Sequence, residues 1–252
     1  MKIPAQRKAG SKRLQVKGER TRQTILEAAV DIASVAGLEG LTIGQLATKL
    51  SMSKSGLFAH FGSKEELQLA TVEAARSVFI REVIEPTFAA ERGLARLWQL
   101  CDAWFSYVSS KVFRGGCFFA AAAAEFDSRP GPVRDRIAAI MKEWLSILAR
   151  LVADAQTGGQ FDKEVDPQQL AFEINAVELA ANWAFQLFQD RLAFDRARIA
   201  TLERLRRFAT PRGLDVLPAK PGKRQTRTPP RVAALARTKS SSKKSKGQGV
   251  RH

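Results

Sequence analysis

The sequence predicts an all-α protein in which an N-terminal three-helix helix-turn-helix domain is joined to a C-terminal helical bundle. Apolar residues recur at helical spacing and almost nowhere in the alternation typical of strands. Helix-capping patterns occur in the N-terminal third, and beyond Pro86 the apolar helices become longer, as in a bundle. With 252 residues, 45% of them hydrophobic, the chain is long enough to form a substantial core.

The N-terminal part reads as four helices, and the first is expected from Arg20 to Gly37. Ile25, Ala29 and Ala33 share one face of it, and a glycine suits the left-handed residue that ends a helix.

Two short helices follow, joined by a tight turn. Thr42 and Gln45 form a T-x-x-Q capping box at the start of the first, and Ser51–Ser53 interrupts it. The second short helix runs through Phe61, and Ser63 begins a capping box for a longer helix that runs toward Pro86. Two short helices around a turn of about three residues have helix-turn-helix geometry.

The longer apolar helices of the bundle come after Pro86. We expect them at residues 93–110, 117–126, 133–156, 167–189 and 192–208. Asp166 and Pro167 have the composition of an N-cap and first helical residue. Beyond Pro211 the chain is rich in Lys, Ser and Pro, which predicts disorder.

The net charge of +16 is concentrated at the two ends of the chain. Residues 1–22 hold eight lysines and arginines against Glu19, residues 212–252 hold twelve against Asp215, and the rest carries −2. Basic arms attract polyanions, most often nucleic acid, although solvated tails that only maintain solubility are the alternative.

These patterns predict four segments. They are a basic disordered arm (1–19), a helix-turn-helix domain (20–68), a helical domain for effector binding and dimerisation (69–209) and a basic disordered tail (210–252).

The two cysteines, Cys101 and Cys117, have neither metal-ligand spacing nor a disulfide framework. We therefore expect a reducing compartment, no metal and no cofactor. No apolar run approaches the roughly 18 residues of a membrane span, and the N-terminus lacks the apolar core of a signal peptide. The expected protein is soluble and cytoplasmic, associated with the nucleoid, and has no membrane partner.

A helix-turn-helix binds double-stranded DNA by placing its second helix in the major groove. Lys54 and Ser55, in the first turn of that helix, are positioned for base edges. Thr42 and Lys64, at two helix N-termini, are positioned for phosphates, and His60 for the DNA backbone. The alternative for each of these side chains is simple solvation on a helix surface.

The stretch "GLEGLTIGQLATKLSMSKSGLFAHFGSKEELQLA" resembles the DNA-binding segment of the TetR family of bacterial transcriptional regulators. The shared pattern is G-x-x-x-x-T-x-x-x-(I/L)-A, a turn, G-x-L-Y-x-H-F and K-x-x-L. A weaker resemblance to the family's regulatory domain covers "GGCFFAAAAAEFDSRPGPVRDRIA". The resemblance implies an all-helical homodimer, a reading helix at about 54–60, and a C-terminal domain that dimerises and binds a small-molecule effector.

The chain departs from the family pattern at positions that face DNA. Phe58 replaces the usual Tyr and loses a hydroxyl, Ser55 and Gly56 appear in inverted order, and Gly44 offers no side chain. The DNA-binding set predicted from these motifs is Arg22, Thr42, Gln45, Ser53, Lys54, Ser55, Gly56, Phe58, His60 and Lys64.

Aromatic residues from three consecutive helices predict an effector pocket in the bundle. The expected lining is Cys101, Trp104, Phe105, Cys117, Phe118, Glu125 and Trp144. An ordinary aromatic core is the alternative for any one of these residues, and buried structural thiols are favoured over redox sensors for the two cysteines. The alanine run 120–124 leaves space beside bulky neighbours.

The helix expected at 167–189 is apolar on two faces, so one face must pack against another subunit. Leu170, Ile174 and Ala181 mark the face expected inside the subunit. The face expected at the dimer interface holds Phe172, Leu179, Trp183 and Leu187.

The sequence therefore predicts a transcriptional regulator, expected to be a repressor, that binds palindromic operators as a homodimer and is released by an effector. A largely non-specific nucleoid protein that relies on its basic arms is the alternative. An enzyme with His60 as general base is disfavoured, because no catalytic triad, carboxylate pair or phosphate loop accompanies it.

Overall fold

The computed structural model describes residues 5–221, with side chains described from Gly18 onward. Within this range it is almost entirely helical, with one isolated β-bridge between Phe161 and Ala209 and no strand. The helices are α1 (Ala5–Ala36), α2 (Ile43–Leu50), α3 (Lys54–Phe61), α4 (Lys64–Phe79), α5 (Leu94–Ser109), α6 (Phe118–Phe126), α7 (Pro132–Thr157), α8 (Pro167–Leu187), α9 (Ala193–Phe208) and α10 (Pro211–Val216). The predicted all-α fold class is confirmed.

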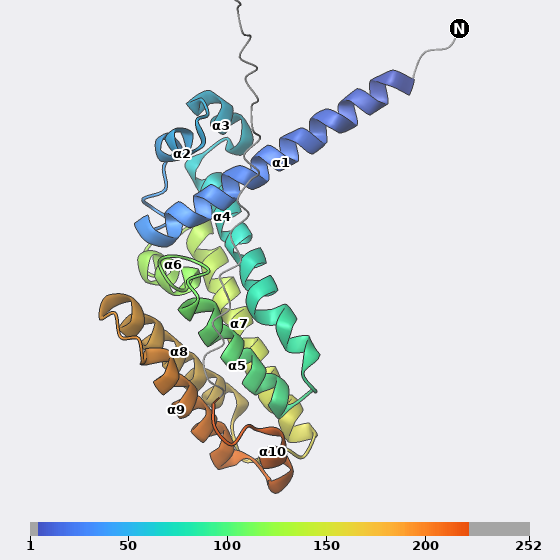
Figure 1. The fold of residues 1–252 in the computed structure, drawn as a ribbon. Helices are drawn as coiled ribbons and strands as arrows, with labels where there is room; N and C mark the ends of the chain where they lie inside the picture. Colours follow the sequence, from blue (N-terminus) through green and yellow to red (C-terminus); the bar gives the residue numbers. More distant parts are fainter. Residues whose placement is uncertain (1–4, 222–252) are drawn as a thin grey trace, which may run out of the picture.

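The chain forms two parts stacked along α4 (Figure 1). The N-terminal part contains α1, α2, α3 and the beginning of α4, and its core includes Ile25, Leu46, Leu57 and Leu67, all of which are fully buried. A π-helical turn at Ile80–Ile84 extends α4 into the second part.

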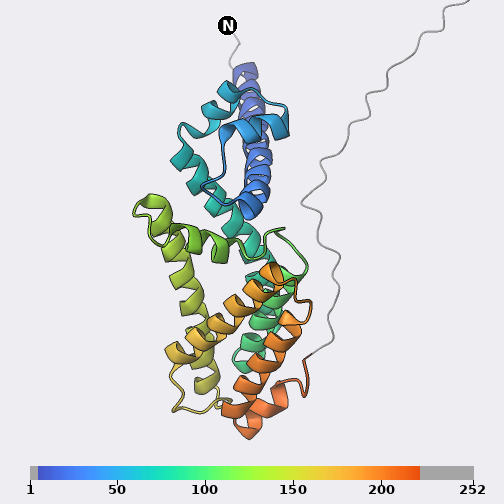
Figure 2. The same cartoon turned by 90° about the vertical axis from the view of Figure 1, so that its left-hand side faces the viewer.

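The second part is a bundle of α5, α7, α8 and α9, closed at its far end by α10. Helix α7 packs against α8 and α8 against α9, while α5 contacts α7, α8 and α9 from inside. Leu97, Leu100 and Phe105 of α5 are completely buried, as their spacing predicted. Helix α6 crosses between the bundle and the N-terminal part (Figure 2).

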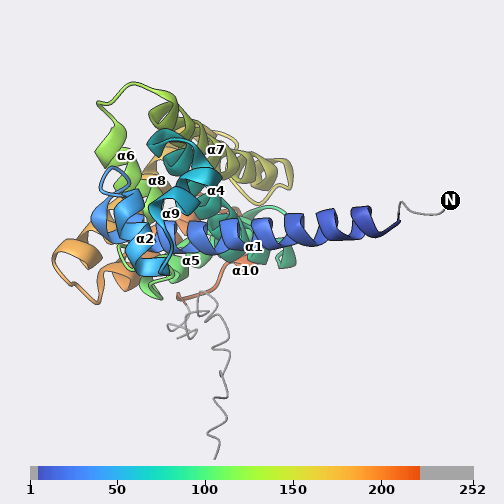
Figure 3. The ribbon, with the colours of Figure 1, turned by 90° about the horizontal axis from the view of Figure 1, so that it is seen from above.

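Two predicted disordered segments are partly helical. Residues 5–19, expected to belong to a basic arm, lie in α1, which extends away from the rest of the molecule (Figure 3). The physical reason is local, since this segment has no proline and is rich in Lys, Arg, Gln and Ala, which favour helix formation.

The predicted tail also begins later than residue 210. Thr210 caps α10 through its side chain, which accepts from the Gly213 N–H, and Leu217 is buried after it. A side chain at Gly213 would overlap the Gln160 carbonyl, so this helix is tightly packed. The remainder of the predicted tail, 222–252, lies outside the described residues, as do residues 1–4 of the predicted arm.

Candidate nucleic-acid interface and effector cavity

The turn between α2 and α3 is fixed by hydrogen bonds that the sequence predicted. Thr42 and Gln45 form the complete capping box, each side chain bonding the other's backbone N–H at 3.2 Å. Ser51 ends α2 in the left-handed conformation, with φ 53°. Ser53 caps α3 by accepting from the Gly56 N–H at 3.1 Å. The orientation of α3 is therefore set by residues within the motif itself.

Helix α3 has one buried side and one exposed side. Leu57 and Phe61 are buried in the core of the N-terminal part, whereas Lys54, Ser55 and Phe58 are exposed. Phe58 is 49% exposed, which is unusual for a phenyl ring with no partner to cover it. The ring predicted to face DNA thus faces solvent in the free protein.

The residues predicted to contact phosphates surround this exposed side. Thr42, Gln45 and Ser53 are exposed, although their side chains also serve the caps described above. Arg22 is exposed, and its guanidinium lies 5.0 Å from the centroid of the Phe61 ring. Gly44 has open space around it, with Lys54 as the nearest neighbouring side chain besides Thr42.

Lys64 and His60 are less free than the sequence suggested. Lys64 Nζ lies 2.6 Å from Glu39 Oε1, and this hydrogen bond, with a second from Gln68, lowers the pKa of the Glu39 carboxyl. His60 is half-buried beside Phe61. A phosphate near Lys64 would therefore compete with Glu39.

A cavity of about 290 Å³ lies in the bundle. Its wall is formed by α4 and its π-helical extension, the segment around Phe88, α5, the start of α6, α7 and α8. The wall is predominantly apolar, and Phe79 packs edge-to-face on Trp144 with 5.3 Å between ring centroids. Ala120 contributes a small side chain to the wall, in agreement with the expectation that the alanine run leaves space.

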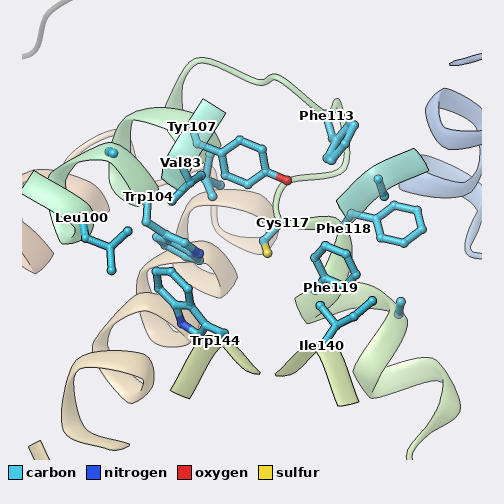
Figure 4. Close-up of a cluster of buried hydrophobic side chains, with 14 of the residues drawn as sticks. Val83, Leu100, Trp104, Tyr107, Phe113, Cys117, Phe118, Phe119, Ile140 and Trp144 are labelled. Carbon is cyan, nitrogen blue, oxygen red and sulfur yellow. The ribbon is translucent and has the colours of Figure 1, made fainter. Parts of the chain in front are cut away.

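Three of the predicted pocket residues, Trp104, Cys117 and Trp144, line this cavity. Figure 4 shows the two indole rings beside each other, with Cys117 and Phe119 across from them. The others lie elsewhere. Cys101 and Phe105 are buried in the core, and Phe118 packs on Phe113.

Glu125 is the clearest correction, because its carboxylate points to the N-terminal part and not into the cavity. The backbone N–H of Leu38 donates to Oε2 at 2.7 Å, and that of Glu39 donates to Oε1 at 2.9 Å. Gly37, with φ 80°, makes room for this contact, since a side chain there would meet the carboxylate at 2.8 Å. Helix α6 therefore begins in the cavity wall and ends on the helix-turn-helix domain.

A second contact crosses the same junction. Arg114, in the loop before α6, donates to Asp31 of α1 at 2.9 and 3.1 Å. Partial desolvation raises the pKa of Asp31, but hydrogen bonds from Lys49 and Arg114 outweigh it, and the net pKa is lowered. The backbone at Gly115 approaches the Ser34 carbonyl so closely that a side chain would overlap it.

Glu178 of α8 is a functional candidate that the sequence interpretation missed. It is only 1% exposed, and Trp144 Nε1 donates to its Oε2 at 3.1 Å. Burial raises the pKa of this carboxyl well above its ordinary value, although the Trp144 bond opposes the shift. Its spacing was a usable signal, because Glu178 lies four residues after Ile174 and three before Ala181 on the buried stripe.

The cysteine thiols are buried and weakly acidic. Burial raises the pKa of Cys117 to about 11, and that of Cys101 well above its ordinary value. Both are free thiols, as predicted. Low reactivity follows, because the thiolate is the reactive form.

The outer face of α8 carries exposed apolar side chains. Phe172, Trp183 and Leu187 are 63%, 55% and 63% exposed. Leu179, predicted on the same face, is half-buried and lines the cavity instead, one turn after Asn175. It is too close to the inward stripe to reach the outer face. Among the described helices, none is long and apolar enough to span a membrane.

Comparison with known proteins assigns both parts to one family. The family model described as bacterial regulatory proteins of the tetR family matches residues 25–71. The model described as a tetracyclin repressor-like C-terminal domain matches residues 93–201. Together the two matches cover more than half of the chain.

Individual relatives agree with this assignment. Transcriptional regulator AcuR of Cereibacter sphaeroides is 22% identical over 171 residues, which are 67% of this chain and 78% of AcuR. HTH-type transcriptional regulator TcmR of Streptomyces glaucescens is 26% identical over 196 residues, which are 76% and 85% of the two chains. The crystal structure of a TetR transcriptional regulator from Chloroflexus aurantiacus matches with a TM-score of 0.71 at 25% identity, over 77% of this chain and 98% of that one.

Proposed function

Because the chain belongs to the TetR family of bacterial regulatory proteins and is thus a DNA-binding transcriptional regulator, we propose that it is a repressor released from its operator by a small molecule. In this proposal a homodimer binds a palindromic operator through its two α3 helices. Occupation of the bundle cavity then lowers the affinity for DNA.

The observation that carries the proposal is the exposed side of α3. A recognition helix needs a rigid attachment and exposed side chains toward the groove. Leu57 and Phe61 supply the attachment, and Lys54, Ser55 and Phe58 are exposed. Lysine donates to guanine O6 and N7, a serine hydroxyl donates or accepts, and a phenyl ring suits the thymine methyl group.

The dimer is proposed from the apolar surface at the C-terminal end of α8. Trp183 and Phe188 stack with 4.5 Å between ring centroids while both remain more than half exposed. Leu187 and Leu192 extend the same exposed region. Burying this surface against its symmetry copy supplies the association energy, and the two-fold axis selects a palindrome.

Release is proposed to pass through α6. The start of this helix forms cavity wall at Phe119 and Ala120, and Glu125 near its end holds the backbone of Leu38 and Glu39. A ligand that fits one position of α6 better than another changes the orientation of the two N-terminal parts. Coupling of this kind requires that the ligand bind the two states with different affinities.

The test is to capture genomic DNA fragments with the full-length protein and sequence them. A few discrete palindromic peaks are the expected result. A flat profile would favour the alternative, a non-specific nucleoid protein, and would overturn the repressor proposal. A parallel capture with Lys54→Ala is the control, since loss of a base contact lowers the peaks without raising general DNA binding.

A further inference from the structure

The cavity has an unsatisfied hydrogen-bonding group behind its wall. Within the described part of the chain, Glu178 Oε1 is buried and has no hydrogen-bond partner, whereas Oε2 accepts from Trp144. The residues around this carboxyl belong to the cavity wall, namely Trp144, Asn175 three residues before it and Leu179 directly after it. A buried polar atom without a partner costs free energy, and a bound molecule can recover it.

The wall around this group consists largely of aromatic rings. Trp104 and Trp144 form one side and Phe119 the other, with Phe79 packed edge-on against both Trp144 and Phe119 (Figure 4). The faces of such rings carry partial negative charge and attract cations, most strongly when water is excluded.

The charged residues at the cavity also favour a positive ligand. Arg76 is the one cation among the lining residues, and it already makes hydrogen bonds of 2.8 and 2.9 Å with Glu143. Glu85, also in the lining, takes part in no described ion pair. An anion would therefore find no available cation, whereas a cation would meet Glu85 on entry and Glu178 at the inner end.

We infer that the cavity binds a hydrophobic organic ammonium ion, whose N–H donates to Glu178 Oε1 while its apolar part lies between Trp104, Trp144 and Phe119. The regulatory consequence rests on the proposed function, but the binding itself does not. On binding, the carboxyl gives up its proton to solvent and the ammonium ion pairs with the carboxylate. The ammonium keeps all its own protons.

Proton release follows from the surroundings of Glu178. The titratable groups that interact with it are the thiols of Cys101 and Cys117, and burial keeps the pKa of both high. The carboxyl is thus the group that changes charge near neutral pH, because burial raises its pKa in the empty cavity. A cation beside it reverses this shift.

Three probes with one carbon skeleton test the inference by calorimetry on the full-length protein. 2-Phenylethylammonium carries the charge, 2-phenylethanol carries a neutral donor, and propylbenzene carries neither. We expect the ammonium to bind at least tenfold more tightly than the alcohol, and about one proton to be released at pH 7, measured from the dependence of the enthalpy on the buffer. Equal affinity of ammonium and alcohol would overturn the inference, as would no detectable ammonium binding at millimolar concentration.

Glu178→Gln is the matched variant, because its amide oxygen can still accept from Trp144. We expect it to lose at least tenfold in ammonium affinity, to release no proton and to bind the alcohol within twofold of the parent. Glu164→Gln, an exposed change in the loop before α8, is the charge control. Equal loss for ammonium and alcohol, with an intact helical circular-dichroism spectrum, would show a structural role and overturn the assignment. Loss in Glu85→Gln alone would place the cation at the mouth of the cavity and overturn it too.

A gel shift with captured operator DNA separates this inference from the proposed function. Ammonium binding with release of DNA supports both. Ammonium binding without release would contradict ligand-released repression and leave the binding site standing.

Discussion

The carboxylate of Glu125 accepts the backbone N–H of Leu38 at 2.7 Å, so that a residue on α6 holds the segment that follows α1. Its other oxygen accepts from the next residue, Glu39, at 2.9 Å. A charged acceptor on two backbone donors makes a stronger contact than a neutral one. The contact links the wall of the cavity to the DNA-binding part of the chain.

Glu125→Ala should therefore weaken the junction and reduce the coupling between the two parts. We expect a loss of about 1.5–3 kcal/mol in the free energy of unfolding, the usual range for hydrogen bonds to a charged group. Urea unfolding measures the loss, and operator affinity with and without bound ligand measures the coupling. Asp127→Ala, one residue beyond α6, is the matched control. Equal stability of the two variants would contradict the role of Glu125.

The sequence predicted contacts that are local and missed those that are not. The Thr42–Gln45 box and the Ser53 cap join residues three apart, so the pattern of residue types was sufficient. Glu125 bonds to residues 86 and 87 positions away. Nothing in the alanine run around it reveals such a partner, and proximity to Phe118 favoured the pocket.

The lining of the cavity shows the same limit. Trp104, Cys117 and Trp144 were predicted because large or soft side chains clustered on helices expected to converge. Asn175 and Leu179 were not expected there, because the rotation of α8 about its axis is set by packing on α7 and α9. Sequence periodicity gives the apolar stripe of a helix but not the residues at its margin.

Lys54 and Lys64 should respond differently when each is replaced by alanine. Lys54 has no described ion pair, and Lys64 is paired with Glu39. We expect Lys54→Ala to lose about 1–3 kcal/mol on operator DNA and little on random DNA, as for a base contact. Lys64→Ala should lose a similar, smaller amount on both. Gel-shift titrations on the two DNAs at fixed salt measure this. Equal losses on both DNAs for Lys54→Ala would remove it from the base-reading set.

Phe58→Tyr should add one hydrogen bond to DNA without disturbing the fold. The ring is 49% exposed, so a hydroxyl at its edge enters solvent in the free protein and costs no buried polar group. We expect a gain of about 1 kcal/mol on operators with an acceptor in reach, and an unchanged melting temperature. Affinity selection of randomised operators compares the sequence preferences of the two proteins, with Phe58→Leu as the control for the ring. Identical preferences and affinities for Tyr and Phe would show that this position does not face DNA.

Removal of residues 222–252 should reduce general DNA affinity and leave operator preference unchanged. The cut preserves α10 and the buried Leu217, so the bundle stays closed. The removed segment is strongly basic in sequence, and each phosphate it neutralises adds about 0.9 to the slope of log affinity against log salt. Gel shifts over a range of salt concentrations should therefore give a flatter slope after truncation. An unchanged slope would identify the segment as a solubility tail.

Glu178→Gln should change how stability depends on pH. Burial raises the pKa of Glu178 in the folded protein above that in the unfolded chain. At low pH both states hold the proton and this residue adds no pH dependence. As pH rises past the ordinary carboxyl value, the unfolded chain loses the proton while the folded protein keeps it, so the free energy of unfolding falls. The fall is about 1.4 kcal/mol for each pH unit between the two pKa values, and the Glu178→Gln variant lacks it because an amide does not titrate.

Urea unfolding at pH 5, 6 and 7 in the presence of a reductant measures this difference. All other titrating groups are common to the two proteins, and the cysteine thiols stay protonated because burial raises their pKa. The stability of the parent relative to Glu178→Gln should therefore decline steadily over this range, whereas Glu164→Gln should follow the parent. A constant difference would mean that Glu178 ionises in the folded protein as readily as in the unfolded chain. That outcome is incompatible with a buried carboxyl whose only described hydrogen bond comes from Trp144.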